Sequence, residues 1–192
     1  MTGPKNAGRS GAGHTPLCEE ANRLVDSGVV VCAAAGNDGY LPLQVNSEGK
    51  DQSVPKLMEM SINDPGNADK VITVASCHKE QPHTYGISYF SSKGPTSDGR
   101  IKPDITAPGE KILTSLKGGR KLGALYSEAS GTSFACPHVA GAVAAFLSAK
   151  GEFIGNPGFV KRLFLESAVD LTREKTFQGH GLVNLMAALS RV

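Results

Sequence analysis

Apolar residues recur along the first part of the chain in a pattern that predicts a helix followed by a strand. The helix starts at Thr15 or Pro16 and runs through Ser27, and Gly28 then ends it. Its predicted apolar face comprises Leu17, Ala21, Leu24 and Val25. The run 29–35, VVVCAAA, is apolar throughout, as is typical of a parallel strand covered on both faces. A helix, a short connection and a buried strand in this order favour an α/β domain built in layers.

Later segments continue this alternation of strands and helices. The apolar runs 71–75 and 112–115 predict two further strands, and the segment 157–169 predicts an amphipathic helix. The face of that helix is formed by Phe159, Val160, Leu163, Phe164 and Ala168. The polar, proline-containing segment 40–69 predicts a long irregular excursion between elements.

The stretch 131–141, GTSFACPHVAG, joins a tight turn to an apolar segment that ends near Leu147. A serine at such a junction, here Ser133, projects its hydroxyl from the end of the helix. The unpaired N–H groups of the helix N-terminus favour an oxyanion that forms beside them. These residue types suit a nucleophile, and they equally suit an N-cap serine at the start of a buried helix.

A second polar cluster, GNDG at 36–39, follows the predicted strand 29–35 directly. The carboxyl ends of strands are where open α/β sheets place their ligands. Asn37 therefore lies where a functional side chain is expected. The alternative is a structural one, because asparagine also tolerates the positive φ angles that turns require.

Composition and charge narrow the classes of function. Hydrophobic residues make up 40% of the chain and charged residues 20%, which is typical of a soluble globular domain. The net charge of +2 favours neither nucleic acid nor an acidic membrane as a partner. The longest apolar runs, 29–36 and 139–147, are too short to cross a bilayer, so we expect no membrane span.

The cysteines show no spacing that is typical of a metal site. They are Cys18, Cys32, Cys77 and Cys136. Cys32 and Cys136 fall in strongly apolar stretches, which favours reduced, buried thiols.

Several of these stretches together resemble the subtilases, the subtilisin-like serine peptidases. The stretch 131–141 resembles their nucleophile signature, and 29–39 resembles the signature that carries their oxyanion asparagine. The proline-containing loops 90–96 and 102–109, and the segment from 179 to the helix ending near Ser190, resemble family segments in the same order. The resemblance implies a subtilisin-like three-layer α/β sandwich with a mostly parallel sheet.

The resemblance also implies a reaction, the hydrolysis of peptide bonds in a peptide or protein substrate. Ser133 would be the nucleophile, and Asn37 and the N–H of Ser133 would stabilise the oxyanion. Substrate-binding residues would be Ala34, Ala35, Gly36 and Thr132. This chemistry requires no metal and no organic cofactor; family members often bind structural calcium, for which no ligand set is assigned here.

The residue pattern departs from the family in its N-terminal part. A serine nucleophile needs a base and an acid that orients it, and subtilases carry this Asp and His before the oxyanion asparagine. The only histidine before Asn37 is His14 and the only aspartate is Asp26, and neither lies in a matching motif. His138 lies inside the serine signature, too close to act as the base, and we expect it to be packed. Residues 1–192 therefore resemble roughly the C-terminal two-thirds of a subtilase domain, with the first strands absent.

Three interpretations of this departure stay open. The chain is a fragment of a complete peptidase, or it is one half of an enzyme whose Asp and His arrive on another chain. In the third interpretation it is a catalytically silent module that binds peptides or regulates a peptidase. Family members are often secreted, whereas the first ten residues here contain no apolar segment of the signal-peptide type.

Overall fold

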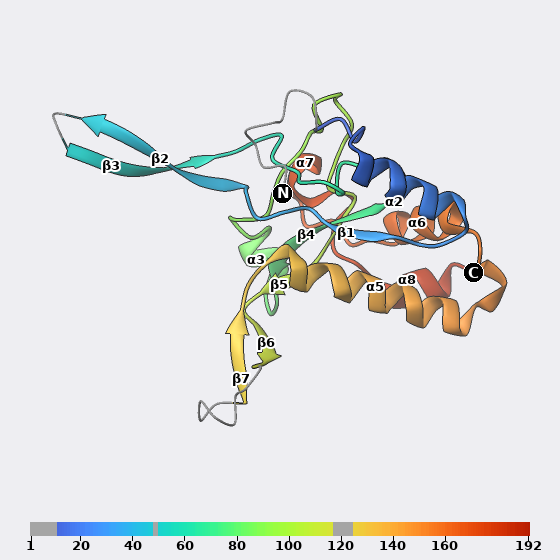
Figure 1. The fold of residues 1–192 in the computed structure, drawn as a ribbon. Coiled ribbons are helices and arrows are strands. Elements are labelled where there is room, and N and C mark those ends of the chain that lie inside the picture. Colours follow the sequence, from blue (N-terminus) through green and yellow to red (C-terminus); the bar gives the residue numbers. More distant parts are fainter. Residues whose placement is uncertain (1–10, 48–49, 117–124) are drawn as a thin grey trace.

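A three-stranded parallel sheet forms the centre of the computed structural model, which describes residues 11–47, 50–116 and 125–192 (Figure 1). The strands are β1 (Cys32–Ala34), β4 (Ile72–His78) and β5 (Ile105–Glu110), in the order β1-β4-β5. Ala33 pairs with Thr73, and Val74 pairs with Ile105. All seven residues of β4 are buried, as expected for the central strand of a sheet that is covered on both faces.

Helices α2 (Pro16–Asp26) and α5 (Thr132–Ala149) lie on opposite sides of this sheet (Figure 1). Side chains of α5 form the main core with Cys32, Val74 and Ile105. Successive residues of a strand point to opposite faces, so Ala33 faces α2 instead, and it packs there with Val25. This arrangement of helix, sheet and helix confirms the predicted three-layer α/β fold.

Three C-terminal helices complete the main core. They are η2 (Gly151–Phe153), α6 (Pro157–Glu166) and α8 (Leu185–Ser190), whereas α7 (Lys175–Gln178) contributes no residue to it. The predicted amphipathic helix is confirmed as α6, whose Val160, Leu163 and Phe164 are buried. The Asn156 side chain accepts a hydrogen bond from the Phe159 N–H and so caps its first turn.

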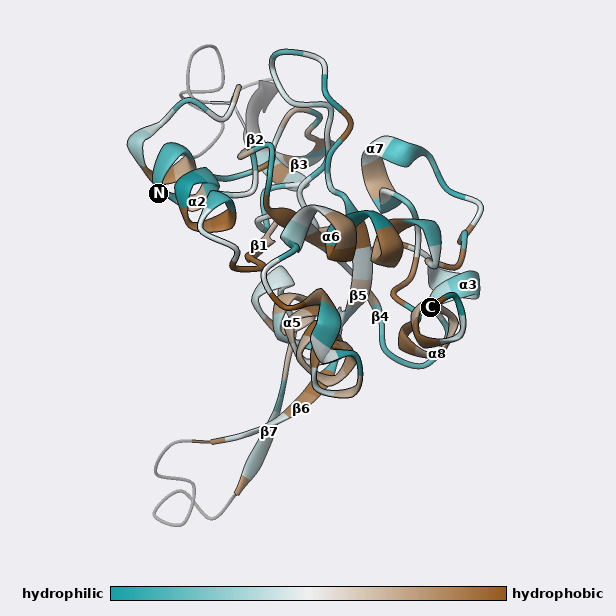
Figure 2. Cartoon of the chain, turned by 90° about the vertical axis from the view of Figure 1, so that its right-hand side faces the viewer, coloured by the Kyte–Doolittle hydropathy of each residue, from teal (hydrophilic) through white to brown (hydrophobic). Residues whose placement is uncertain are grey.

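Helix α2 ends as predicted, but its buried face differs from the predicted one. Leu17 and Leu24 are 56% and 47% exposed, whereas Cys18 and Val25 are buried. The helix is amphipathic, and Figure 2 shows both hydrophilic and hydrophobic residues along it. The face of α2 that contains Cys18 packs against the sheet, because a small thiol allows the helix to approach the sheet more closely than a leucine does.

The first strand is shorter and less covered than its apolar sequence predicts. β1 comprises three residues, and it forms an edge of the sheet in the part of the chain that the structure describes. Val29 is 45% exposed, and only Ala33 and Ala35 are buried. The prediction of coverage on both faces is therefore wrong for this strand.

Two antiparallel ribbons extend from the body of the molecule (Figure 1). One pairs β2 (Tyr40–Ser47) with β3 (Lys50–Leu57), within the segment predicted to be irregular, so that prediction is wrong. The other pairs β6 (Ile112–Ser115), a predicted strand, with β7 (Tyr126–Ala129). Pro42 and Pro55 face each other in the first ribbon. Since proline has no N–H, each removes a donor from an outer edge, which protects the ribbon against further strand pairing.

Two local predictions about loops are also wrong. The segment 102–109 was predicted to be a loop, but it includes most of β5. Pro108 pairs with Cys77 there, and its missing N–H is tolerated because β5 lies at the margin of the sheet. The hydrophilic sequence that surrounds His78 predicts a solvated loop histidine, whereas His78 ends β4 with 9% exposure and packs against Tyr85 of the short helix α3 (Pro82–Tyr85).

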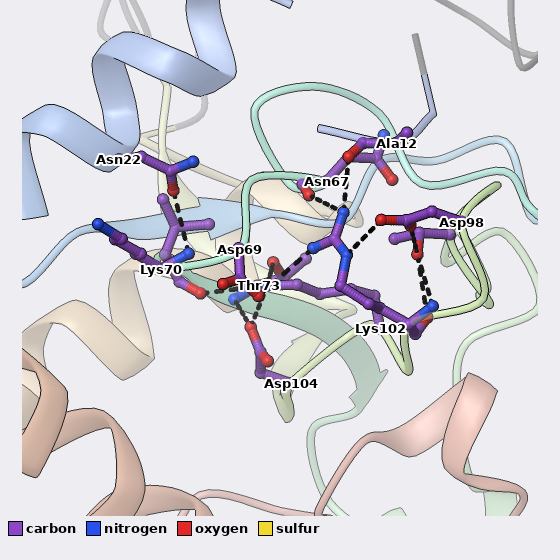
Figure 3. A network of polar contacts seen from close by, with 12 residues as sticks. Ala12, Asn22, Asn67, Asp69, Lys70, Thr73, Asp98, Lys102 and Asp104 are labelled. Atoms are coloured by element: carbon purple, nitrogen blue, oxygen red, sulfur yellow. Dashed lines mark hydrogen bonds and ion pairs between the residues drawn. The ribbon is translucent and has the colours of Figure 1, made fainter. Parts of the chain in front are cut away.

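A buried ion pair just before β5 is hydrogen-bonded to the central strand β4 (Figure 3). The Lys102 side chain is 2% exposed, and its Nζ lies 2.6 Å from Asp104 Oδ2 and 2.8 Å from Thr73 Oγ1. Asp104 Oδ2 also accepts the Thr73 N–H at 2.7 Å, and Lys161 approaches Oδ1 at 3.3 Å. Burial lowers the pKa of Lys102, and the charge of Asp104 opposes part of this decrease, so that the pKa is about 8.

Asp104→Ala should lower the free energy of unfolding by about 3 kcal/mol, because it leaves a buried ammonium without its counter-charge. Urea denaturation at pH 7 measures the difference. Asp69→Ala is the matched control: its carboxylate is 73% exposed beside Arg100, so the expected loss is below about 0.5 kcal/mol. Equal losses in the two variants would show that the buried pair has no special role.

Candidate active site

The oxyanion candidate, Asn37, follows β1 and is held by the start of α5. Its Oδ1 accepts hydrogen bonds from the Thr132 N–H at 2.9 Å and from Thr132 Oγ1 at 3.1 Å. The Thr132 hydroxyl in turn accepts the Gly36 N–H at 3.2 Å. With its oxygen engaged by Thr132, the Asn37 side chain has a fixed orientation, and its Nδ2 donors point away from Thr132.

The start of α5 is also tied to β5. The Gly131 N–H donates to the Gly109 carbonyl at 2.8 Å. A side chain at Gly109 would come within 2.7 Å of the Gly131 oxygen, so this close approach requires glycine. The N-terminal end of α5 is therefore fixed between the carboxyl ends of two strands, which is where the sequence places the site.

Ser133 is the second residue of α5 and is exposed, as Asn37 is. Its hydroxyl projects from the helix end, where the first N–H groups have no partner within the helix. Thr132 connects the two candidates directly, since it binds the Asn37 amide and precedes Ser133 in the chain. The structure thus brings together the two predicted catalytic residues.

The predicted substrate-binding residues form the inner layer of the same region. Ala34 ends β1 and is half-buried, while Ala35 is fully buried and donates to the Val74 carbonyl at 2.9 Å. Gly36 has a φ of 108°, a conformation that glycine favours. Thr132 is fully buried, so its side chain holds the Asn37 amide and does not face solvent.

Neither of the two histidines singled out from the sequence lies against Ser133. His14 precedes α2 and lies 3.5 Å from Glu19, with its side chain 74% exposed. His138 was expected to be packed, but it is exposed and its Nδ1 lies 2.7 Å from the Phe134 carbonyl oxygen. It points outward because another face of α5, which includes Val139, packs against the sheet. Within the described residues, no histidine or carboxylate is hydrogen-bonded to Ser133.

Residues that the sequence did not single out support the loop after Asn37. Ser92 Oγ accepts the Asp38 N–H at 3.0 Å, and the Ser92 N–H donates to the Gly36 carbonyl at 2.9 Å. Asn63 Nδ2 donates to the Asp38 carboxylate at 2.7 Å. These contacts join segments far apart in sequence, and no local pattern predicts them.

Lys93 anchors the neighbouring aromatic segment, and no carboxylate of the described residues pairs with it. Its Nζ donates to the carbonyls of Tyr89 and Ser91, at 3.1 Å and 2.9 Å, and lies 5.3 Å from the centre of the Phe177 ring. The side chain is almost fully buried, and this burial lowers the pKa of Lys93 to about 8.

Comparison with known proteins identifies the family. Residues 3–181 match the model described as "Subtilase family". The chain belongs to the subtilase family. The sequence resemblance is thereby confirmed, and the subtilisin-like fold is confirmed by the structures to which this subtilase chain is similar.

Curated relatives agree with this assignment. Serine protease AprX of Bacillus subtilis (strain 168) is 32% identical over 183 residues, which cover 88% of this chain and 37% of AprX. Subtilisin J of Geobacillus stearothermophilus is 33% identical over 177 residues, covering 92% of this chain and 38% of the relative. This subtilase chain therefore spans less than half the length of these relatives.

Solved structures share the same architecture. The prenylagaramide maturation protease PagA has a TM-score of 0.65 and 25% identity, covering 90% of this chain and 54% of that chain. The patellamide maturation protease PatA has a TM-score of 0.67 and 24% identity, covering 94% of this chain and 58% of that chain.

Helix α5 bears on the expectation that the chain has no membrane span. By length and composition, its residues Thr132–Ala149 are long and apolar enough to cross a membrane, because the helix extends beyond the apolar run 139–147. In this structure α5 lies against the sheet as a core helix. Length and composition alone are weak evidence for a span.

The structure also describes the cysteines and the side chains that could bind a metal ion. The described residues contain no cluster of three or more histidine, cysteine or carboxylate groups placed to hold a metal ion. Cys32 and Cys136 are free thiols, as predicted, although each is only partly buried. Burial raises the pKa of Cys32 to about 12, and it also raises the pKa of Cys136, so both stay protonated near neutral pH.

Lys93 should make folding more stable as the pH rises. Between about pH 8 and 10.5 the folded chain has released a proton that the unfolded chain still binds, so the free energy of unfolding increases with pH. Lys93→Met should remove this increase, on the order of 2 kcal/mol between pH 8 and 10. Urea denaturation at several pH values measures it. Lys175→Met, at an exposed site, should leave the slope unchanged, and an unchanged slope in Lys93→Met would contradict the assignment.

Proposed function

We propose that this chain forms the part of a subtilisin-like serine endopeptidase that carries the nucleophile and the oxyanion site. The observation that supports this most directly is the link between Asn37 and Thr132, which sets an amide donor beside the N-terminal end of the helix that bears Ser133. Membership in the subtilase family supports the same reaction class. The substrate is a peptide or a protein.

In the proposed reaction, Ser133 Oγ attacks the carbonyl carbon of a peptide bond while a base takes the hydroxyl proton. The carbonyl oxygen becomes negatively charged, and the Asn37 Nδ2 and the Ser133 N–H donate to it. The tetrahedral intermediate then collapses, the amine leaves with a proton, and an acyl group stays on Ser133. Water hydrolyses this ester and regenerates the serine.

The base and its orienting acid come, in this proposal, from outside the described residues. Neither His14 nor His138 is bonded to Ser133, and each has another partner or faces solvent. The chain spans 37% of AprX, which agrees with a domain of which another part supplies these groups. That part is either further sequence of a longer protein or a separate chain, and residues 1–192 form a partial peptidase domain.

A catalytically silent module is the second candidate. It is favoured by one observation, the lack of a base beside Ser133 among the described residues. Such a module would bind peptides or regulate a peptidase, and its binding would not depend on the Ser133 hydroxyl. An exposed hydroxyl held beside a fixed amide donor favours the enzyme instead, since binding alone requires neither.

Labelling by a fluorophosphonate probe should separate these candidates, because the probe reacts with an activated serine. We expect little labelling of the purified chain and clear labelling at Ser133 in an extract of the source organism. Ser133→Ala should abolish the labelling. Asn37→Ala should slow it about 10²–10³-fold, the loss in kcat seen when such a donor is removed from subtilisin itself.

The controls are structural and kinetic. Both variants should keep the circular dichroism of the wild type. The melting temperature of Ser133→Ala should be unchanged because Ser133 is exposed, and that of Asn37→Ala should fall by a few degrees because Thr132 loses its acceptor. Rapid labelling of the purified chain would contradict an external base. Absence of labelling in both conditions, with peptide binding that survives Ser133→Ala, would favour the silent module.

A further inference from the structure

A cavity of about 350 Å³ lies beyond the carboxyl ends of β4 and β5. Tyr85 and Tyr89 contribute exposed aromatic rings, and Ile87, His78 and Glu110 complete most of its wall. The Tyr85 ring rests on the His78 ring, with 4.7 Å between their centres. Its surface is more apolar than polar, although Ser88, Glu110 and Lys111 also line it, and such a mixture is typical of a small-ligand or side-chain pocket.

Two backbone connections place this cavity next to the proposed active site. On one wall, Glu110 follows Gly109, whose carbonyl accepts the Gly131 N–H at the start of α5. On the other wall, Tyr89 precedes Phe90, whose carbonyl accepts the Gly39 N–H just after the Asn37 loop. The segments that line the cavity therefore lead directly into the segments that hold the proposed site.

Aromatic rings extend from the active-site loop to the cavity. Tyr40 lies three residues after Asn37, and its ring meets the Tyr89 ring edge to face at 6.4 Å. Phe90 stacks edge to face on the other side of Tyr89 at 5.4 Å. Tyrosine rings exposed together in this way are common where proteins bind peptides, because each offers a rigid apolar surface with a polar tip.

We propose that this cavity binds a large apolar side chain of the peptide substrate, at a residue other than the one whose carbonyl Ser133 attacks. The inference rests on the proposed function and adds a substrate preference to it. Glu110 and the neighbouring Lys111 carry opposite charges at the rim, which leaves the cavity without a strong preference for a charged side chain. Tyr85 and Tyr89 are thus specificity-determining residues.

The test uses fluorescein-labelled alanine heptapeptides in which one phenylalanine is scanned through each position. The protein is the Ser133→Ala chain, which binds but does not cleave, and fluorescence anisotropy gives each dissociation constant. We expect one phenylalanine position to bind about tenfold more tightly than the all-alanine peptide. Lysine or glutamate at that position should bind no better than alanine.

Ring-removal variants assign the effect to the cavity. Tyr85→Ala and Tyr89→Ala should each lose most of the gain from phenylalanine, while Tyr89→Phe, which keeps the ring, should retain it. Tyr126→Ala is the matched control, because Tyr126 is similarly exposed, at 61%, but does not line the cavity. It should leave the gain unchanged.

Three results would overturn the proposal. They are equal affinity for phenylalanine and alanine at every position, a gain that survives removal of both rings, and a clear preference for a charged side chain. Fluorophosphonate labelling of Ser133 is independent of all three. Labelling without a phenylalanine preference would reject the cavity alone, and a preference that depends on the rings without labelling would reject the catalytic role alone.

Discussion

The attachment of α5 at two strand ends is the constraint on which the site depends. The Gly131 N–H binds the Gly109 carbonyl at the end of β5, and the Thr132 N–H binds the Asn37 amide oxygen just past β1. Both contacts use N–H groups that an α-helix leaves unpaired at its start. A requirement of any helix end is therefore met in a way that also orients an oxyanion donor beside Ser133, with no further element needed.

One face of α5 has no cover in the described part of the chain, although the helix is apolar on nearly all sides. Ala140 and Ala144 are exposed there, and with Cys32 and Cys136 they line a cavity of about 380 Å³ beside the short edge strand β1. Helices that are apolar all round are normally buried. In the proposed function, the part of the domain that supplies the base to Ser133 would also have this apolar face of α5 to pack against.

The layered fold, α2 and α6 could be predicted from local patterns in the sequence, whereas the placement of Asn37 with the serine helix was implied by the resemblance to the subtilases. Apolar periodicity identifies a helix, and strand ends mark ligand positions. The features that could not be predicted depend on contacts with residues that are distant in the sequence. Leu17 is as apolar as Val25, yet only the second meets the sheet, and His78 is buried because Tyr85 covers it.

The same distinction separates the proposed catalytic residues from the proposed specificity cavity. Ser133 lies in a contiguous stretch of sequence that resembles the nucleophile signature of the subtilases. Tyr85 and Tyr89 lie in the segment after β4, whereas Glu110 ends β5, and the two segments meet because β4 and β5 run parallel and end together. Substitutions in these loops change the cavity without touching the hydrogen bonds that fix Asn37. A rigid sheet end with variable loops beyond it therefore allows substrate preference to change while the oxyanion geometry stays constant.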